Sequence, residues 1–427
     1  MEILNEQVNI ELQKILNATQ ETEYYKQYFS SASIQKKASL NLSDFPILTY
    51  QDVQREGSRF LCSRYHQYPD ISNLLLKRCF GLFGIPHTVY WDIQDDACSQ
   101  AFLRKYRKEQ FDIAENEKGC MFCVAQYAGN KIMDYTPMSM SQDGKIMSLF
   151  IQDLTNEKIK WCLEAIYKFN PVWLCLSPSI ALMLIDSIVI NQKSMPSSLR
   201  YIELYGEILD ERTENIIKNF FHVQIGNVYA TKAAGIVAVS CIYGHLHILE
   251  RNAVVEIMRH GKSVLDEEGD VCITSLQNTA MLLVRLRNGD RGMVQSIPCP
   301  CGQASPRLCL TQGKRSHFII TKSGRRISAR ILRSIAEYTN EEISRCLSYI
   351  QFRQMEHNRM DIILGVKPAF SGWEHEAARI FIEKLQDPEL KQMYWNFIYD
   401  GLDKDNEIAK YEHLFFESME RKDSNAE

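Results

Sequence analysis

The sequence predicts a mixed α/β protein with a large N-terminal domain and a small C-terminal α+β domain. Two observations support this prediction. Between Leu75 and about Leu310, short apolar runs of strand length alternate with helical stretches, as expected for a body with several sheets. The chain has 427 residues, more than one hydrophobic core normally organises, so a second, smaller domain is expected.

The first element is an N-terminal helical cap over residues 1–45. Val8, Leu12 and Leu16 recur at helical spacing, and Asp44-Phe45-Pro46 ends the pattern. Strands in the large body are expected at Trp173 to Leu176, Tyr201 to Leu204, Val223 to Asn227 and Val271 to Thr274.

The pattern changes after Gly313, and we place the domain boundary there, between residues 1–312 and 313–427. The second part is predicted to begin with a hairpin about Ser323-Gly324 and to continue with a helix. A strand follows at Met360 to Val366. This order of elements indicates a small α+β unit that could move against the large one.

Composition excludes several classes of partner. A formal net charge of -4 gives no general attraction to nucleic acid or to an anionic membrane. No window approaches about 18 uninterrupted apolar residues, so no membrane span is expected. The acidic N-terminus does not resemble a signal peptide, and thirteen cysteines without a disulfide pattern suit a reducing compartment. We therefore expect a cytoplasmic protein.

Two cysteine-containing pairs suggest a structural metal. Cys241 and His247 form one pair, and Cys299 and Cys301 flank a proline in the other. Three thiolates and one imidazole match the closed tetrahedral sites that hold zinc. His245 is an alternative nitrogen ligand and Cys309 an alternative sulfur ligand, and ordinary buried cysteines are the competing interpretation.

Five blocks of sequence, taken in order, resemble phenylacetate-CoA ligases and related adenylate-forming enzymes. They are Tyr201-Ile-Glu-Leu-Tyr-Gly-Glu207, Asn227-Val-Tyr-Ala-Thr231, Gly269-Asp-Val-Cys-Ile-Thr-Ser-Leu276, Arg285-Leu-Arg-Asn-Gly-Asp290 and Cys299-Pro-Cys-Gly302. Weaker matches cover nearly the whole chain. The resemblance implies that a carboxylate is joined to AMP with release of pyrophosphate, then passed to coenzyme A, a carrier protein or an amine. It also implies a C-terminal lid that rotates between the two half-reactions.

The same resemblance assigns a nucleotide site. Asp290 matches the carboxylate that accepts hydrogen bonds from both ribose hydroxyls, although an Asn-Gly-Asp segment by itself is an ordinary turn. Gly206 and Glu207 match the segment along the adenine, where a glycine allows close backbone approach. The implied nucleotide-binding set is Gly206, Glu207, Asn227, Tyr229, Ala230, Thr231 and Asp290.

The phosphate loop departs from the family pattern. Members carry T-S-G-S-T-G-x-P-x-K, whose hydroxyls, amides and lysine surround the phosphates. The matching segment here keeps Gly81 and Gly84, but Leu82 and Phe83 replace hydroxyl residues and Thr88 replaces the lysine. We expect the turn to persist and its phosphate chemistry to be lost.

A second anion-binding motif is also altered. Members read Y-G-S-T-E, with the threonine on the phosphate and the glutamate on magnesium; here Lys232 and Ala233 take those two positions. The local charge therefore rises by about two units, comparable to the divalent ion. Our hypothesis is that Lys232 replaces magnesium and holds an anionic group, which argues against magnesium dependence. The alternative is that Lys232 only extends into solvent.

Lid residues are assigned by the same resemblance. Lys314 matches an arginine that reaches the ribose and phosphate, and it keeps the charge without the bidentate geometry. Ser316 stands where the hinge aspartate is usual, and Arg326 matches a second lid arginine. Lys410 is our candidate for the catalytic lysine that bridges carboxylate and α-phosphate, although an exposed helix face explains it equally well.

Two functions remain open at this point. One is a ligase that uses ATP to activate a small carboxylate, apolar or aromatic because the segment from Trp173 to Ser179 offers no charge. The other is a pseudoenzyme of the same fold that binds nucleotide or acyl ligand and acts as partner of another protein. Dimers are common in such relatives, so a homodimer is a further expectation.

Overall fold

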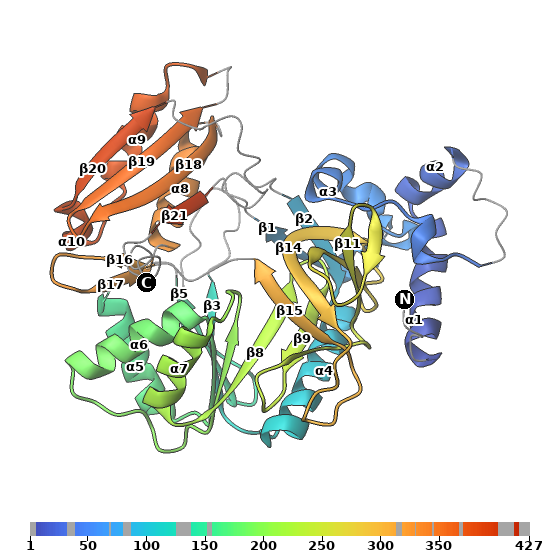
Figure 1. Ribbon diagram of the computed structural model, residues 1–427, viewed down its shortest axis with the longest axis horizontal. Coiled ribbons are helices and arrows are strands. Elements are labelled where there is room, and N and C mark those ends of the chain that lie inside the picture. The colour runs from blue at the N-terminus through green and yellow to red at the C-terminus, as the bar shows by residue number, and fades with distance from the viewer. Residues whose placement is uncertain are drawn as a thin grey trace.

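The computed structural model contains a large body and a smaller C-terminal unit (Figure 1). It describes residues 6–31, 39–67, 70–79, 87–124, 138–151, 156–312, 318–328, 330–343, 346–366, 370–399 and 414–417. No helix within these ranges is both long enough and apolar enough to cross a membrane.

The N-terminal part is helical and packs onto the large body. Its helices are α1 (Glu6–Ala18), α2 (Glu23–Ser31) and α3 (Tyr50–Glu56). Tyr25 is fully buried, and its hydroxyl accepts a hydrogen bond of 3.2 Å from the amide of Val284. Leu12 and Leu16 lie in the same core cluster, so the expected helical cap is held by a continuous apolar contact.

Thirteen strands form one sheet in the order β12-β11-β13-β14-β15-β10-β9-β8-β7-β6-β3-β5-β4. Their bounds are β3 (Gly119–Val124), β4 (Met138–Met140), β5 (Ile146–Ile151), β6 (Trp173–Leu176), β7 (Tyr201–Tyr205), β8 (Gln224–Thr231), β9 (Gly235–Ser240), β10 (Leu246–Ile248), β11 (Ala253–Arg259), β12 (Lys262–Val264), β13 (Gly269–Ser275), β14 (Leu286–Gln295) and β15 (Arg307–Gln312). All four strands expected from the sequence are present, and β8 continues four residues beyond the expected end.

The sheet changes character at β8. From β5 through β3, β6 and β7 to β8 neighbouring strands are parallel, and from β8 onward they are antiparallel. Parallel strands need crossover connections, which helices provide here. The crossover helices are α5 (Asn156–Phe169), α6 (Pro178–Ile190) and α7 (Glu211–Phe221), whereas α4 (Ile93–Phe111) precedes the first strand of this sheet. One core cluster joins α5, α6 and α7 to the sheet, and another joins α4 to it (Figure 1).

A separate two-stranded sheet pairs β1 (Leu74–Cys79) with β2 (His87–Asp92). The pair is antiparallel, and Cys79 lies opposite His87. The strands contain Cys79, His87 and Thr88, which are the ends of the segment predicted to be the altered phosphate loop, and residues 80–86 between them lie outside the described residues.

The C-terminal unit has its own core. Its elements are β16 (Phe318–Ile320), β17 (Arg326–Ser328), α8 (Arg330–Glu342), β18 (Leu347–Glu356), β19 (Arg359–Val366), α9 (Glu374–Glu383), α10 (Pro388–Lys391), β20 (Tyr394–Tyr399) and β21 (Leu414–Glu417). The expected hairpin is confirmed, with Gly324 at φ 82° in its turn. One core cluster covers residues 319–393, while Ile320 also packs against the large body. The boundary near residue 313 stays a prediction.

Candidate functional site

Tyr229, Asn288 and Asp290 form a compact polar group. The Tyr229 hydroxyl donates to Asp290 Oδ2 at 2.6 Å, and Asn288 Nδ2 donates to the same oxygen at 2.7 Å. Asn288 Nδ2 also donates to the Tyr229 hydroxyl oxygen at 2.6 Å. These three side chains therefore hold one another in a single arrangement.

Curvature of the sheet brings this group together. Tyr229 lies on β8 and Asp290 on β14, with β9, β10 and β15 between them in the sheet. Four spacings of about 4.8 Å would separate the two strands by roughly 19 Å in a flat sheet. A tyrosine side chain cannot span that distance, so the antiparallel part of the sheet must curl strongly.

Burial disfavours the ionised form of the Asp290 carboxyl. Burial raises its pKa above the ordinary value, and the hydrogen bonds from Tyr229 and Asn288 oppose that increase. Both bonds end on Oδ2, so within the described part of the chain Oδ1 is the oxygen left to accept a ligand's hydroxyl. The sequence prediction that Asp290 can accept hydrogen bonds is compatible with this geometry.

Gly206 and Glu207 follow the end of β7. Gly206 has φ 79°, a conformation that favours glycine, and a Cβ built there would meet no described atom within 4 Å. Glu207 is buried and accepts hydrogen bonds from both the amide and the hydroxyl of Ser179, at 3.0 and 2.9 Å. Glu207 thus fixes the start of α6, while Gly206 leaves open space beside the strand end.

The end of β8 carries the altered motif. The amide of Asn227 donates to Ser240 Oγ at 2.7 Å, and Ala230 is exposed. The Thr231 hydroxyl oxygen accepts the amide of Ala234 at 2.9 Å, which closes a tight turn. Lys232 is exposed in this turn, and Ala233 is only 4% exposed within the apolar core. Position 233 therefore offers no ligand to a metal ion.

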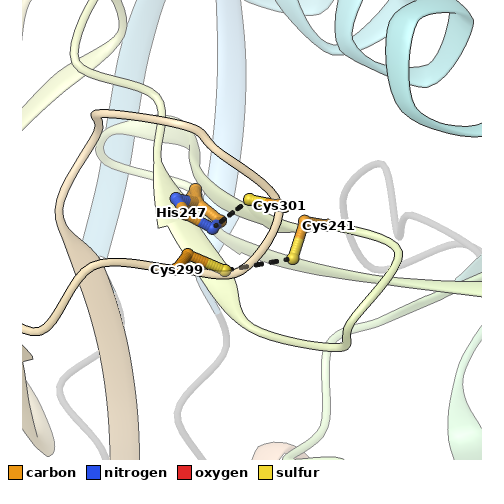
Figure 2. Close-up of side chains that lie close together, drawn as sticks. All are labelled: Cys241, His247, Cys299 and Cys301. Atoms are coloured by element: carbon orange, nitrogen blue, oxygen red, sulfur yellow. Dashed lines mark hydrogen bonds between the residues drawn. The ribbon is translucent and has the colours of Figure 1, made fainter.

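Four side chains, one from β10 and three from two connecting loops, converge at one place. Cys241 follows β9, His247 lies on β10, and Cys299 and Cys301 lie in the connection between β14 and β15 (Figure 2). Their four ligand atoms all lie within 4.8 Å of one another. Sulfur ligands of a tetrahedral zinc lie about 3.8 Å apart, so the cluster has the size that such an ion requires.

Neighbouring groups favour the tautomer of His247 and the ionised form of Cys299 that bind a cation. His247 Nδ1 lies 3.0 Å from the carbonyl oxygen of Ser305, which can only accept, so Nδ1 carries the proton. Nε2 then faces Cys301 Sγ at 3.3 Å with its lone pair. Burial opposes ionisation of Cys299, but the amide of Cys301 and the ring of His245 lower its pKa to about 5. A thiolate at Cys299 is the form that a metal binds.

The alternative ligands are placed differently. His245 Nδ1 lies 3.2 Å from Cys299 Sγ, so it contacts the cluster from the side, whereas Cys309 is exposed on β15. The residues brought together are those of the first-choice set, Cys241, His247, Cys299 and Cys301. Their occupation by zinc stays a prediction.

Several predicted residues lie outside the description. Gly81, Gly84, Lys314 and Lys410 fall in segments that the structure does not describe. The backbone of Arg326 lies on β17, but its side chain is not described. The predictions for the phosphate loop and the lid therefore stay predictions.

The sequence reasoning did not assign two residues that the structure places at these sites. Asn288 precedes Asp290 by two positions on β14, and their side chains meet at 2.7 Å across Gly289, whose φ of 88° interrupts the regular strand. That spacing was a usable signal. Ser305 contacts His247 through its carbonyl oxygen, a contact that no side-chain pattern can reveal.

Comparison with known proteins shows a similarity of fold without a close relative. No family model matches the chain, and no curated protein matches it. A solved structure of 2-hydroxyisobutyryl-CoA ligase with 2-HIB-AMP and CoA, in the thioesterification state, matches with a TM-score of 0.67 and 13% identity. The match covers 98% of this chain and 91% of that one.

Two further structures of the same ligase agree. In the postadenylation state with 2-HIB-AMP the TM-score is 0.59 at 12% identity, covering 98% of this chain and 90% of that one. An open conformation gives 0.57 at 12% identity, with 93% and 89% covered. The chain has the fold of an adenylate-forming CoA ligase, with a large N-terminal and a small C-terminal part. The resemblance to adenylate-forming enzymes is confirmed at this level.

Proposed function

We propose that this protein binds the adenylate part of ATP or of an acyl-adenylate and acts as a carboxylate-activating ligase whose Lys232 replaces magnesium. The observation that carries the proposal is the preorganised group of Tyr229, Asn288 and Asp290, in which both donors bind Oδ2 of the carboxylate and Oδ1 can accept a ligand's hydroxyl. The turn that bears Lys232 follows the strand of Tyr229 directly. Asp290 on β14, held by its hydrogen bond from Tyr229, and the Lys232 ammonium would therefore both act near the end of β8.

The chemistry of such a ligase has two balanced steps. A carboxylate oxygen attacks the α-phosphorus of ATP and pyrophosphate leaves, which forms the acyl-adenylate. A thiol or amine then attacks the acyl carbon, and AMP leaves with the former carboxylate oxygen. Asp290 would orient the ribose, and Lys232 would offset negative charge at the phosphate. Coenzyme A is the first acceptor to test, because the similar ligase is described with CoA.

The test is isothermal titration with ATP and with AMP, each with and without magnesium. Binding of AMP that does not respond to magnesium supports the proposal. A requirement for magnesium would contradict the role of Lys232 and indicate a conventional adenylating site. Release of pyrophosphate with a panel of small apolar and aromatic carboxylates then tests turnover.

A pseudoenzyme is the second candidate, and one observation favours it. The position that carries the metal-binding glutamate in related enzymes is occupied here by the buried Ala233. Loss of one oriented group at a reacting phosphate costs about 3–4 kcal/mol of transition-state stabilisation. Nucleotide binding without pyrophosphate release for any carboxylate would favour this candidate. Absence of nucleotide binding would contradict the ligase and leave only a pseudoenzyme that binds an acyl ligand or a protein partner.

We also propose that Cys241, His247, Cys299 and Cys301 bind a structural zinc ion. Three thiols and one imidazole within 4.8 Å form a closed set with no vacant position for substrate. The ion would tie the turn after β9 to the connection between β14 and β15. Because β14 carries Asp290, this tie would support the curl that forms the nucleotide site.

Metal analysis of the purified protein should find about one zinc per chain. Cys301→Ser should abolish it and lower the midpoint of thermal unfolding by at least about 5 °C. Cys309→Ser is the matched control, because that exposed thiol lies outside the cluster. Equal zinc content in the Cys301→Ser variant would contradict the assignment.

A further inference from the structure

Trp91 links two segments that are far apart in the sequence. It lies on β2, the strand that follows residues 80–86, and its side chain is fully buried. Its indole Nε1 donates a hydrogen bond of 2.8 Å to the carbonyl oxygen of Lys232. One side chain thus joins the β1–β2 hairpin to the turn that bears Lys232.

The turn is shaped to receive the indole ring. Gly235 has φ 72°, and a Cβ there would lie 3.1 Å from Trp91 Cη2 and 2.6 Å from Ser99 Oγ. Any side chain at position 235 would therefore displace the ring or the turn. Lys77 places its ammonium 4.2 Å from the centre of the indole ring and also pairs with Asp96. The ring is thus held by contacts from several elements.

We propose that Trp91 is a positioning residue that fixes the backbone of residues 231–235 and thereby sets where Lys232 can reach. The inference rests on the proposed function, in which Lys232 binds the phosphate. A lysine side chain has four rotatable bonds, so the position of its backbone limits the volume that its ammonium explores. Anchoring that backbone lowers the entropy lost when the ammonium binds an anion.

The hydrogen bond has a second consequence. Because Trp91 belongs to β2, any displacement of the β1–β2 hairpin is transmitted to the Lys232 carbonyl. The β1–β2 hairpin and the Lys232 turn are therefore coupled through one indole, even though 141 positions of sequence separate the two bonded residues. Loss of the N–H should loosen the turn without removing the lysine.

The test uses Trp91→Phe, which deletes the N–H and keeps an aromatic ring. AMP affinity should fall by about 3- to 10-fold, the range expected for one net hydrogen bond. In a Lys232→Ala background the same substitution should have no further effect. Trp395→Phe is the matched control, because Trp395 Nε1 donates a bond of the same 2.8 Å to the carbonyl oxygen of Leu390 in the C-terminal unit.

Hydrogen exchange supplies a readout that needs no nucleotide. Amides of residues 231–235 should exchange faster in Trp91→Phe, whereas those of the C-terminal unit should not. An equal loss of affinity with and without Lys232, or unchanged exchange in this turn, would overturn the proposal. If the wild-type protein binds no nucleotide, the proposed function fails, and the exchange data alone decide whether Trp91 fixes the turn.

Discussion

The ribose end and the phosphate end of the candidate nucleotide site are built differently. At the ribose end, Asn288 is buried and Tyr229 and Asp290 are half-buried; hydrogen bonds of 2.6 to 2.7 Å join the three. At the phosphate end, Lys232 is exposed on a turn that is held by its backbone. The first region is organised by hydrogen bonds among its own functional side chains, and the second by hydrogen bonds that the Thr231 hydroxyl and the Trp91 indole make to the backbone of the turn.

This difference suggests which part of the site was retained. Burying a carboxylate costs desolvation free energy, which two neutral hydrogen-bond donors offset only in part. Such a group is therefore expected to have a use. An exposed lysine has no such cost, because solvent stabilises its charge. The contrast therefore predicts that nucleotide affinity depends more strongly on the ribose end than on the phosphate end.

The largest effect is expected for Asp290→Ala. Hydrogen bonds from ribose hydroxyls to a charged acceptor contribute about 1.5–3 kcal/mol each, so AMP affinity should fall by about 100-fold or more. Asp270→Ala is the matched control, because Asp270 is a partly exposed carboxylate on the adjacent strand β13, paired with Arg287. Calorimetry measures both variants. Similar losses in the two would mean that Asp290 contributes only to folding.

A smaller effect is expected for Lys232→Ala. An exposed ammonium contributes a screened attraction to a phosphate, so AMP affinity should fall by about 10-fold, and the loss should shrink as salt is added. Lys262→Ala, at an exposed lysine on β12, controls for the change in net charge. If Lys232→Ala weakens binding more than Asp290→Ala does, the contrast between the two ends is wrong.

The smallest effect on AMP affinity is expected for Asn288→Leu. The dependence of AMP affinity on pH is the most sensitive measurement of it. In the proposed function, the ionised Asp290 carboxylate accepts hydrogen bonds from the ribose hydroxyls. AMP affinity should therefore fall as the pH drops through the pKa of this carboxyl. Burial raises that pKa, so the fall begins at a higher pH than for an ordinary aspartate. Loss of the Asn288 bond removes a stabilising contact of the charged form and should raise the midpoint by about 0.5–1 pH unit.

Titrations of wild type and Asn288→Leu with AMP across the acidic range give both midpoints. An unchanged midpoint would show that Asn288 does not stabilise the charged carboxylate. A midpoint that moves to lower pH would contradict the sign of the argument. Thermal unfolding of each variant separates these effects from a loss of folding.

Local patterns predicted much of the fold. The strand at Trp173–Leu176 and the hairpin about Gly324 were predictable because short apolar runs and turn residues act over a few positions. The cysteine and histidine pairs also predicted which four ligand atoms converge, since few residue types bind zinc. Residue types with strong intrinsic preferences carry such information without any knowledge of the fold.

The contacts around the site were not predictable in the same way. Asn288 was visible as part of a turn, but its bond to Tyr229 requires strands β8 and β14 to approach across a curled sheet. No sequence pattern indicated a role for Trp91, and its bond to a backbone carbonyl leaves no trace in sequence. Contacts that span 59 and 141 positions depend on the whole topology.

The sequence by itself determined the class of fold, the expected strand positions and the substitution of Lys232 and Ala233 in the phosphate motif. The Asn288-Gly289-Asp290 segment, which by itself is typical of a turn, lies within strand β14 instead. Only the tertiary structure decided that Oδ2 of Asp290 is occupied by Tyr229 and Asn288, and that Trp91 holds the Lys232 turn. The physical reason is the sequence separation over which each kind of interaction acts. Periodicity and turn preferences act between near neighbours in the chain, whereas these hydrogen bonds form only after the sheet has curled and its core has closed.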